Sequence, residues 1–239
     1  MNTRKVNAKQ CKMVAHRGCS GLEKENTLAA FIAAGNRSYW GVETDVHRTA
    51  DGEYVVIHDS ETGRVAGDNI VIENTSFEYI RSLRLKDIDG TRTRADLRIP
   101  TLREYIAICK KYEKNCVLEF KTVYTLEQVA EMVEIIKEEG WLEHVVFISF
   151  AYDNLLNLRK ILPGHPAQFL TGEYTDAMVE MIHKDKIDLD IYFSALDEEK
   201  IKHLHDLGII VNAWTVDDPE KAQQLIDCGI DYITSNICE

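Results

Sequence analysis

Three acidic residues form the clearest candidate metal site in this sequence. Glu43 and Asp45 lie two residues apart in one apolar run, so their side chains point to the same face if this run is a strand. Glu119, followed two residues later by Lys121, repeats the spacing in another apolar run. Carboxylates that point into a protein interior are costly without a cation, and an all-oxygen ligand set favours Mg²⁺, Ca²⁺ or Mn²⁺ over zinc or copper. We therefore expect one divalent cation at Glu43, Asp45 and Glu119, rather than three solvated acids at strand ends.

Two histidines and an arginine could add proton transfer and phosphate binding to this site. His16 and His58 each follow an apolar run. A lone histidine is more often structural, but two that converge on a carboxylate metal site can divide the roles of general acid and general base. The planar guanidinium of Arg17 suits phosphate oxygens, with a surface ion pair as the alternative. Trp214 could be either a core residue or an aromatic wall beside a substrate. Together these residue types predict metal-assisted chemistry on a phosphate.

Short strand-like runs alternate with helical patterns along the chain. We predict strands at 12–16, 41–46, 116–121, 144–150, 167–171, 190–194, 209–215 and 230–234. We predict helices at 26–37, 76–85, 102–112, 126–139, 154–162, 176–184, 198–207 and 219–228. Asn26 or Thr27 could cap the first of these helices, and Thr101 could cap the third. Residues 60–99 are the least regular part of the chain and are expected to form an excursion over one face of the domain.

A further strand-like run, 54–58, follows the second predicted strand after only seven residues, which include an Asp-Gly pair. A parallel crossover needs about a dozen residues or more, so we expect these two runs to form an antiparallel hairpin on a tight turn. The return arm of the hairpin would bring His58 back toward the candidate metal site.

Alternation of strands and helices over 239 residues is typical of a closed parallel (β/α)₈ barrel, the TIM-type fold, whose usual size is ~250 residues. An open doubly wound α/β sheet is the alternative, but no predicted strand is followed by G-x-G-x-x-G or by a Walker-type glycine loop. In a barrel the chemistry lies at the C-terminal ends of the strands. The candidate residues that fall on this edge are His16, Arg17, Glu43, Asp45, Glu119, Lys121 and Trp214.

The composition limits what the chain can bind. With 45% hydrophobic residues and only 4 prolines, it can form one sizeable core, and we expect a single domain spanning 1–239. The formal net charge of −12 argues against nucleic acid or an anionic membrane as a partner, so an anionic substrate would need a local basic patch. Residues 1–12 lack an apolar signal-peptide core, and no run approaches ~18 apolar residues. We therefore expect a cytoplasmic protein without a membrane span; the sequence does not indicate its oligomeric state.

The other residues that often bind metals give no second candidate site. The six cysteines form no C-x-x-C pair and have no histidine at zinc-finger spacing, so zinc is not expected and most of them should be buried apolar residues. We interpret the six histidines other than His16 and His58 as surface or packing residues. His47 is the doubtful one, because it shares the strand face of Glu43 and Asp45.

Eight short motifs, taken in order, resemble those of the glycerophosphodiester phosphodiesterase family, and the match runs from about Val14 to Thr234. The motifs are His16-Arg17-Gly18, Glu25-Asn26-Thr27, Glu43-x-Asp45-Val46, Thr49-x-Asp51-Gly52, Val56-Ile57-His58-Asp59, Ile99-Pro100-Thr101-Leu102, Leu118-Glu119-Phe120-Lys121 and Trp214-Thr215-Val216. Each motif is weak alone, but the ordered set is very specific. Two positions depart from the family pattern: Lys24 stands where a proline is common, and Ser235-Asn236 replaces a common Asp-Tyr pair. Neither is a proposed metal ligand.

This resemblance implies a TIM-type barrel that hydrolyses small-molecule glycerophosphodiesters to sn-glycerol 3-phosphate and an alcohol. It assigns metal binding to Glu43, Asp45 and Glu119, acid and base catalysis to His16 and His58, and phosphate binding to Arg17 and Lys121. Two alternatives use the same site: hydrolysis of a lysophospholipid, as by a lysophospholipase D, and binding of a phosphate compound without turnover. The excursion has few of the glycines common there in the family, so the resemblance leaves the alcohol specificity open.

Overall fold

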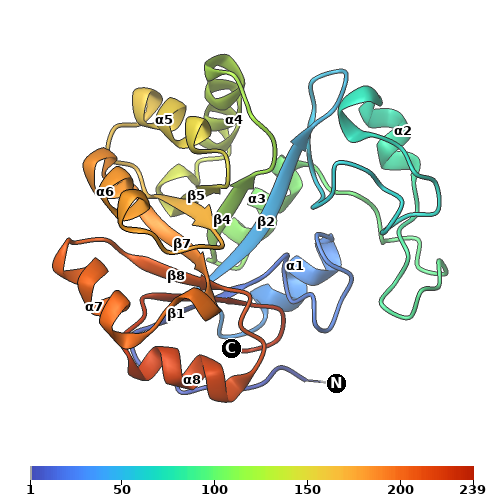
Figure 1. The fold of residues 1–239 in the computed structure, drawn as a ribbon. Helices are drawn as coiled ribbons and strands as arrows, with labels where there is room; N and C mark the ends of the chain where they lie inside the picture. Colours follow the sequence, from blue (N-terminus) through green and yellow to red (C-terminus); the bar gives the residue numbers. More distant parts are fainter. Residues whose placement is uncertain (1) are drawn as a thin grey trace.

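Eight parallel strands close into a barrel at the centre of the computed structural model, which describes residues 2–239 (Figure 1). The strands are β1 (Lys12–Ala15), β2 (Gly41–Arg48), β4 (Asn115–Phe120), β5 (Val145–Ser149), β6 (Ala167–Thr171), β7 (Asp188–Tyr192), β8 (Val211–Trp214) and β9 (Tyr232–Ser235). Each strand pairs with the next, and β1 pairs with both β9 and β2, which closes the ring. The predicted (β/α)₈ barrel is therefore confirmed, and the open doubly wound sheet is excluded.

Helices surround this barrel (Figure 1). They are α1 (Leu28–Gly35), α2 (Phe77–Ser82), α3 (Leu102–Lys111), α4 (Leu126–Glu138), α5 (Tyr152–Ile161), α6 (Asp176–Asp185), α7 (Glu198–Asp206) and α8 (Pro219–Asp227), with short 3₁₀ turns at Ile72–Asn74, Leu142–His144 and Phe193–Ala195. Thr101 caps α3 through a capping box with Glu104, as expected, and Thr27 rather than Asn26 caps α1. Within residues 2–239, every helix is too short or too polar to cross a membrane.

The alternation of side chains along each strand divides the interior into two apolar regions. Outward-facing residues such as Leu118, Phe147 and Leu189 pack against the helices in the main core. The barrel interior holds a smaller cluster, which consists of Val14, Val117, Val146, Ile148, Leu170 and Tyr232 with Trp40 and Trp214 at its margin. The inward-facing positions near the C-terminal ends of the strands are thus free to carry polar groups.

The chain between β2 and α3 leaves the barrel. Strand β3 (Tyr54–Val56) pairs antiparallel with β2, with Val46 opposite Val56, which confirms the predicted hairpin. Residues 60–99 follow as an excursion that contains α2 and lies outside the barrel beside β2 (Figure 1). The excursion has its own apolar cluster, formed by Val65, Ala66, Ile72, Ile80, Leu83, Leu85, Leu97 and Ile99 together with Val55 and Ile57 of the hairpin arm.

Candidate active site

The three predicted metal ligands lie together inside the barrel. Glu43 and Asp45 point inward from β2, and the register between β2 and β4 places Glu119 directly opposite Asp45. All three residues are buried, and one carboxylate oxygen from each lies within 4.8 Å of the others. Among residues 2–239 this is the only group of three or more acidic, histidine or cysteine side chains that meets this distance. The strand register therefore brings the three carboxylates into one compact site.

The electrostatics of this triad fit a bound cation. Burial and the two neighbouring carboxylates raise the pKa of Glu43 well above its ordinary value, and burial and Asp45 raise the pKa of Glu119 to about 8. Burial would raise the pKa of Asp45 too, but Lys121 and Arg17 hold it below its ordinary value. Asp45 Oδ1 accepts no hydrogen bond from any residue that the structure describes. A divalent cation with oxygen ligands would offset the repulsion among the three carboxylates and give Asp45 Oδ1 a partner.

Two basic side chains border the triad. Lys121 Nζ lies 2.8 Å from Glu119 Oε1 and 3.4 Å from Asp45 Oδ1. Arg17 Nη1 lies 3.0 Å from Glu25 Oε1, and its Nε lies 3.5 Å from Asp45 Oδ2. Both side chains are mostly buried, so their charges are weakly screened by solvent. They supply the local positive charge that an anionic substrate needs on a chain with a net charge of −12.

A tight turn after β1 places His16 beside the triad. Arg17 and Gly18 have positive φ angles of 54° and 76°, and a Cβ on Gly18 would lie 2.7 Å from Ala30, so the close approach to α1 requires glycine. The Arg17 backbone N–H donates to Glu43 Oε2 at 2.8 Å and fixes the turn to the triad. As a result, His16 Nε2 lies 3.9 Å from the same Glu43 oxygen.

The other ring nitrogen of His16 is held by Asn236, which the sequence marks only as a departure from the family pattern. His16 Nδ1 lies 2.8 Å from Asn236 Oδ1, while Asn236 Nδ2 donates to Asp217 Oδ2 at 2.7 Å. Because the amide oxygen can only accept, the Nδ1 of His16 carries the proton and Nε2 faces the triad with its lone pair. Burial, and then Arg17, lower the pKa of His16 to about 4.

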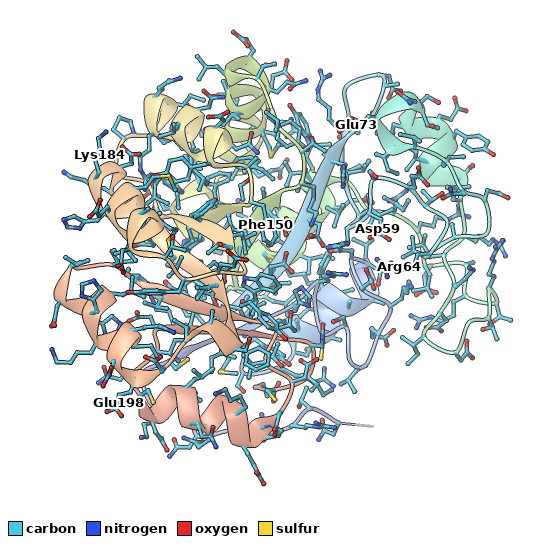
Figure 2. The ribbon with its side chains drawn as sticks, viewed as in Figure 1. Asp59, Arg64, Glu73, Phe150, Lys184 and Glu198 are labelled. Carbon is cyan, nitrogen blue, oxygen red and sulfur yellow. The ribbon has the colours of Figure 1, made fainter. Side chains whose placement is uncertain are left out.

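His58 follows the return arm of the hairpin and lines the same cavity as His16, as predicted. Its Nδ1 lies 2.7 Å from Asp59 Oδ1, and Arg64 Nε lies 2.6 Å from Asp59 Oδ2. Figure 2 shows Asp59 and Arg64 next to each other where the excursion meets the barrel. Burial lowers the pKa of His58, although Asp45 and Asp59 oppose this effect. His47, the other histidine on the strand face of Glu43 and Asp45, has its Nε2 3.2 Å from the His58 carbonyl oxygen. It therefore supports the backbone at His58.

Asn26 is a further residue of the site that periodicity does not reveal. Its Nδ2 donates to Asp45 Oδ2 at 2.7 Å, and its Oδ1 accepts from Thr44 Oγ1 at 2.9 Å. Both contacts depend on a positive φ of 53°, a conformation that asparagine tolerates better than most residues. Asn26 thus orients a proposed metal ligand, and the only signal for it in the sequence is the Glu25-Asn26-Thr27 motif.

A cavity of about 90 Å³ opens at the C-terminal end of the barrel. Six of the predicted site residues line it: His16, Arg17, Glu43, His58, Glu119 and Trp214. The Trp214 ring packs against Phe150 and Tyr192 at centroid distances of 5.6 and 5.5 Å, so it forms an edge of the cavity with part of the ring exposed. Figure 2 shows Phe150 near the centre of this end of the barrel. The structure therefore brings all the predicted site residues together.

The fold and the groups at its C-terminal end define a class of enzyme, the phosphoric diester hydrolases with a TIM-barrel fold. The model of the Glycerophosphoryl diester phosphodiesterase family matches residues 16–238, and the chain belongs to this family. It is 29% identical over 230 residues to the glycerophosphodiester phosphodiesterase of Caldanaerobacter subterraneus subsp. tengcongensis. This alignment covers 94% of the present chain and 93% of that protein.

Solved structures agree with this assignment. A phosphodiesterase of Oleispira antarctica, in complex with the product sn-glycerol-3-phosphate, aligns with a TM-score of 0.88 at 27% identity, over 98% of this chain and 96% of that chain. A glycerophosphodiester phosphodiesterase of Thermotoga maritima aligns with a TM-score of 0.76 at 28% identity, over 95% and 94% of the two chains.

Proposed function

We propose that this protein hydrolyses glycerophosphodiesters to sn-glycerol 3-phosphate and an alcohol, with a divalent cation held by Glu43, Asp45 and Glu119. The observation that carries the proposal is the convergence of this buried triad with two imidazoles on one small cavity. Membership of the family and the product bound to the Oleispira antarctica relative support the same substrate class. Mg²⁺, Ca²⁺ and Mn²⁺ all suit the carboxylate ligands.

Arg17 and Lys121 bind the substrate phosphate in this mechanism. Their charged groups donate hydrogen bonds to the non-bridging oxygens and stabilise the negative charge that grows on them in the transition state. A cation held by Glu43, Asp45 and Glu119 would supply further positive charge to stabilise this transition state. Glu25 keeps the Arg17 guanidinium in place through the 3.0 Å contact, which limits the reorganisation needed when substrate arrives.

The two histidines transfer the protons, and their different partners suit them to different roles. The Asn236 amide fixes the His16 tautomer with Nε2 unprotonated, so His16 takes the proton of the attacking hydroxyl. The Asp59 carboxylate stabilises the protonated form of His58, so His58 gives a proton to the departing alkoxide. The attacking hydroxyl belongs to water or to the glycerol 2-hydroxyl.

Release of sn-glycerol 3-phosphate from glycerophosphocholine tests this function. We expect turnover with Mg²⁺, Mn²⁺ or Ca²⁺, loss of turnover in EDTA, and recovery when the cation is restored. His16→Ala and His58→Ala should each lower kcat roughly 10²- to 10⁴-fold, because each removes one proton transfer. His183→Ala, on α6 outside the site, is the matched control and should keep full activity. A loss of less than about threefold for His16→Ala would remove His16 from the mechanism.

A second candidate function is hydrolysis of a lysophospholipid at the same site. The observation in its favour is an aromatic lip beside the cavity, where Phe150 and Tyr192 are 50% and 40% exposed next to Trp214. Assay of lysophosphatidylcholine beside glycerophosphocholine decides between the two functions. No turnover of either compound, nor of diesters with other head groups, would leave a barrel that binds phosphate compounds without hydrolysing them.

A further inference from the structure

One carboxyl group in the active-site cavity has no role in the mechanism above. Asp190 lies on β7 between Leu189 and Ile191, which both point outward into the main core, so its side chain points into the barrel. It lines the cavity together with the proposed catalytic histidines and is only 1% exposed. It does not belong to the acidic triad. Asp190 is therefore a buried acid that faces the reaction site from the side of the barrel opposite β2 and β4.

One oxygen of this carboxyl group lacks a partner in the part of the chain that the structure describes. Asp190 Oδ1 accepts no hydrogen bond from any of the residues 2–239. Its neighbours in register do not supply one, because Leu170 is apolar and the Asn212 amide nitrogen donates to Gln168 Oε1 instead. By contrast, Asp188, two residues earlier on the same face, accepts the Ile210 backbone N–H at 3.0 Å. A buried polar atom without a partner is costly, and such atoms in native proteins usually have a ligand or another functional reason.

The surroundings of Asp190 indicate what kind of partner would fit. Ile148 and Leu170 give the cavity apolar walls, and its volume of about 90 Å³ suits a short carbon chain rather than an acyl chain. Lys121 and Arg17 face the triad, so neither basic residue is directed at Asp190. A group with hydroxyl donors on a small carbon skeleton satisfies both the apolar walls and the unmet acceptor.

We propose that Asp190 is a specificity residue that accepts a hydrogen bond from a hydroxyl of the glycerol moiety whose phosphate rests on Arg17 and Lys121. This inference rests on the proposed function and deepens it, because it assigns recognition of the polyol to β7 and recognition of the phosphate to Arg17, in the turn after β1, and Lys121, directly after β4. A site built around a hydroxyl discriminates strongly against an analogue that lacks it, because the buried acceptor is then left unpaired.

The test compares sn-glycerol 3-phosphate with propyl phosphate, which has the same three-carbon chain without hydroxyls. Dissociation constants are measured by calorimetry with the cation-loaded protein. We expect the wild-type protein to prefer sn-glycerol 3-phosphate by at least about tenfold, and Asp190→Leu to lose this preference while it binds propyl phosphate as before. Asp190→Asn keeps an acceptor oxygen and should retain most of the preference. Asp188→Leu, the same change at the partnered position on the same strand face, is the matched control and should keep the preference.

The outcomes separate this inference from the proposed function. If the wild-type protein binds both ligands equally well, or if Asp190→Leu keeps the wild-type preference, the role of Asp190 is overturned while the phosphate site stands. If the wild-type protein binds neither ligand, the proposed function fails and the inference fails with it. Circular dichroism and propyl phosphate binding show whether Asp190→Leu folds. If this variant does not fold, Asp190→Ala takes its place. Loss of the preference for sn-glycerol 3-phosphate in Asp190→Ala supports the inference, and retention of the preference overturns the inference.

Discussion

At the scale of single residues, the acidic triad depends on uncharged neighbours as well as on its own charges. Asp45 has one oxygen oriented by Asn26, which leaves the other free to face a cation. A carboxylate held in this way loses less freedom when it binds a metal, so neighbouring hydrogen bonds commonly tune affinity.

Asn26→Gly tests this dependence without straining the backbone, because glycine accepts the positive φ of this position. We expect the affinity for Mn²⁺ to fall about 10- to 100-fold, since Asp45 loses its donor. Isothermal titration calorimetry measures the dissociation constant. Asn115→Ala, at the opposite end of the barrel on β4, is the control and should bind Mn²⁺ as the wild-type protein does. Equal affinities in the two variants would contradict a role for Asn26.

Protons and the cation should compete for the triad. The raised pKa values of Glu43 and Glu119, the latter about 8, mean that cation binding displaces protons at neutral pH. Affinity should therefore rise with pH, by about tenfold per pH unit for each proton displaced, and the part of this rise that is due to Glu119 should level off above about pH 8. Mn²⁺ titrations in buffers with different ionisation enthalpies count the protons released. An affinity that does not change with pH would show that the three carboxylates are already ionised.

The sequence predicts that a residue belongs to the site only where its spacing from other residues or its chemical type indicates this. The i, i+2 spacing of Glu43 and Asp45 places both on one strand face, so the triad could be anticipated. The contact between Asn236 and His16 joins residues 220 positions apart, and no local pattern predicts such a pair. Asp190 had no signal either, because an acid on a predicted strand does not reveal whether it has a partner.

At the scale of elements, ion pairs connect the excursion to the segment between β1 and α1. Arg64 contacts Asp59, the partner of His58, at 2.6 Å and Glu25, the partner of Arg17, at 2.7 Å. Arg94 makes a second link, to Glu23 at 2.6 Å. Arg64 thus connects Asp59, which contacts His58, with Glu25, which contacts Arg17.

Arg64→Ala should lower kcat about tenfold, because Asp59 and Glu25 each lose a charge-assisted hydrogen bond and hold His58 and Arg17 less firmly. The dissociation constant for the cation should not change, since Arg64 contacts none of the three ligands. Arg103→Ala is the matched control, because Arg103 also bridges two carboxylates, Glu138 and Glu139, which are not among the site residues. Equal kcat values for the two variants would show that Arg64 only stabilises the fold.

The hairpin could be predicted because seven residues are too few for a parallel crossover. The register between β2 and β4 could not, since both strands are buried along their length and their hydrophobic patterns fit several alignments. The irregular path of residues 60–99, and with it the position of Arg64, is set by tertiary contacts rather than by periodicity.

At the scale of the whole molecule, the barrel and the excursion have separate apolar clusters. The main core extends through all the barrel strands and most helices, whereas the excursion cluster consists of ten buried residues and little regular structure. The barrel itself was predictable because strand and helix signals alternate along nearly the entire chain, and this alternation does not depend on the details of any one element.

Hydrogen exchange followed by mass spectrometry should show this division. Amides in residues 60–99 should exchange at least about tenfold faster than those of the barrel strands, because fewer apolar contacts oppose local opening. Addition of Mg²⁺ should slow exchange in β2 and β4, which carry the triad, and leave the excursion little changed. A single uniform exchange rate for both regions would show that they open as one cooperative unit.

The position of His58 makes activity and cation binding sensitive to damage in different parts of the protein. This histidine follows an arm whose Val55 and Ile57 belong to the excursion cluster, while the triad belongs to the barrel. Proteolytic nicking or heat damage confined to the excursion would therefore lower turnover while the cation still bound with normal affinity. A preparation with a normal metal content can therefore have lost activity, so specific activity is the proper measure of its quality.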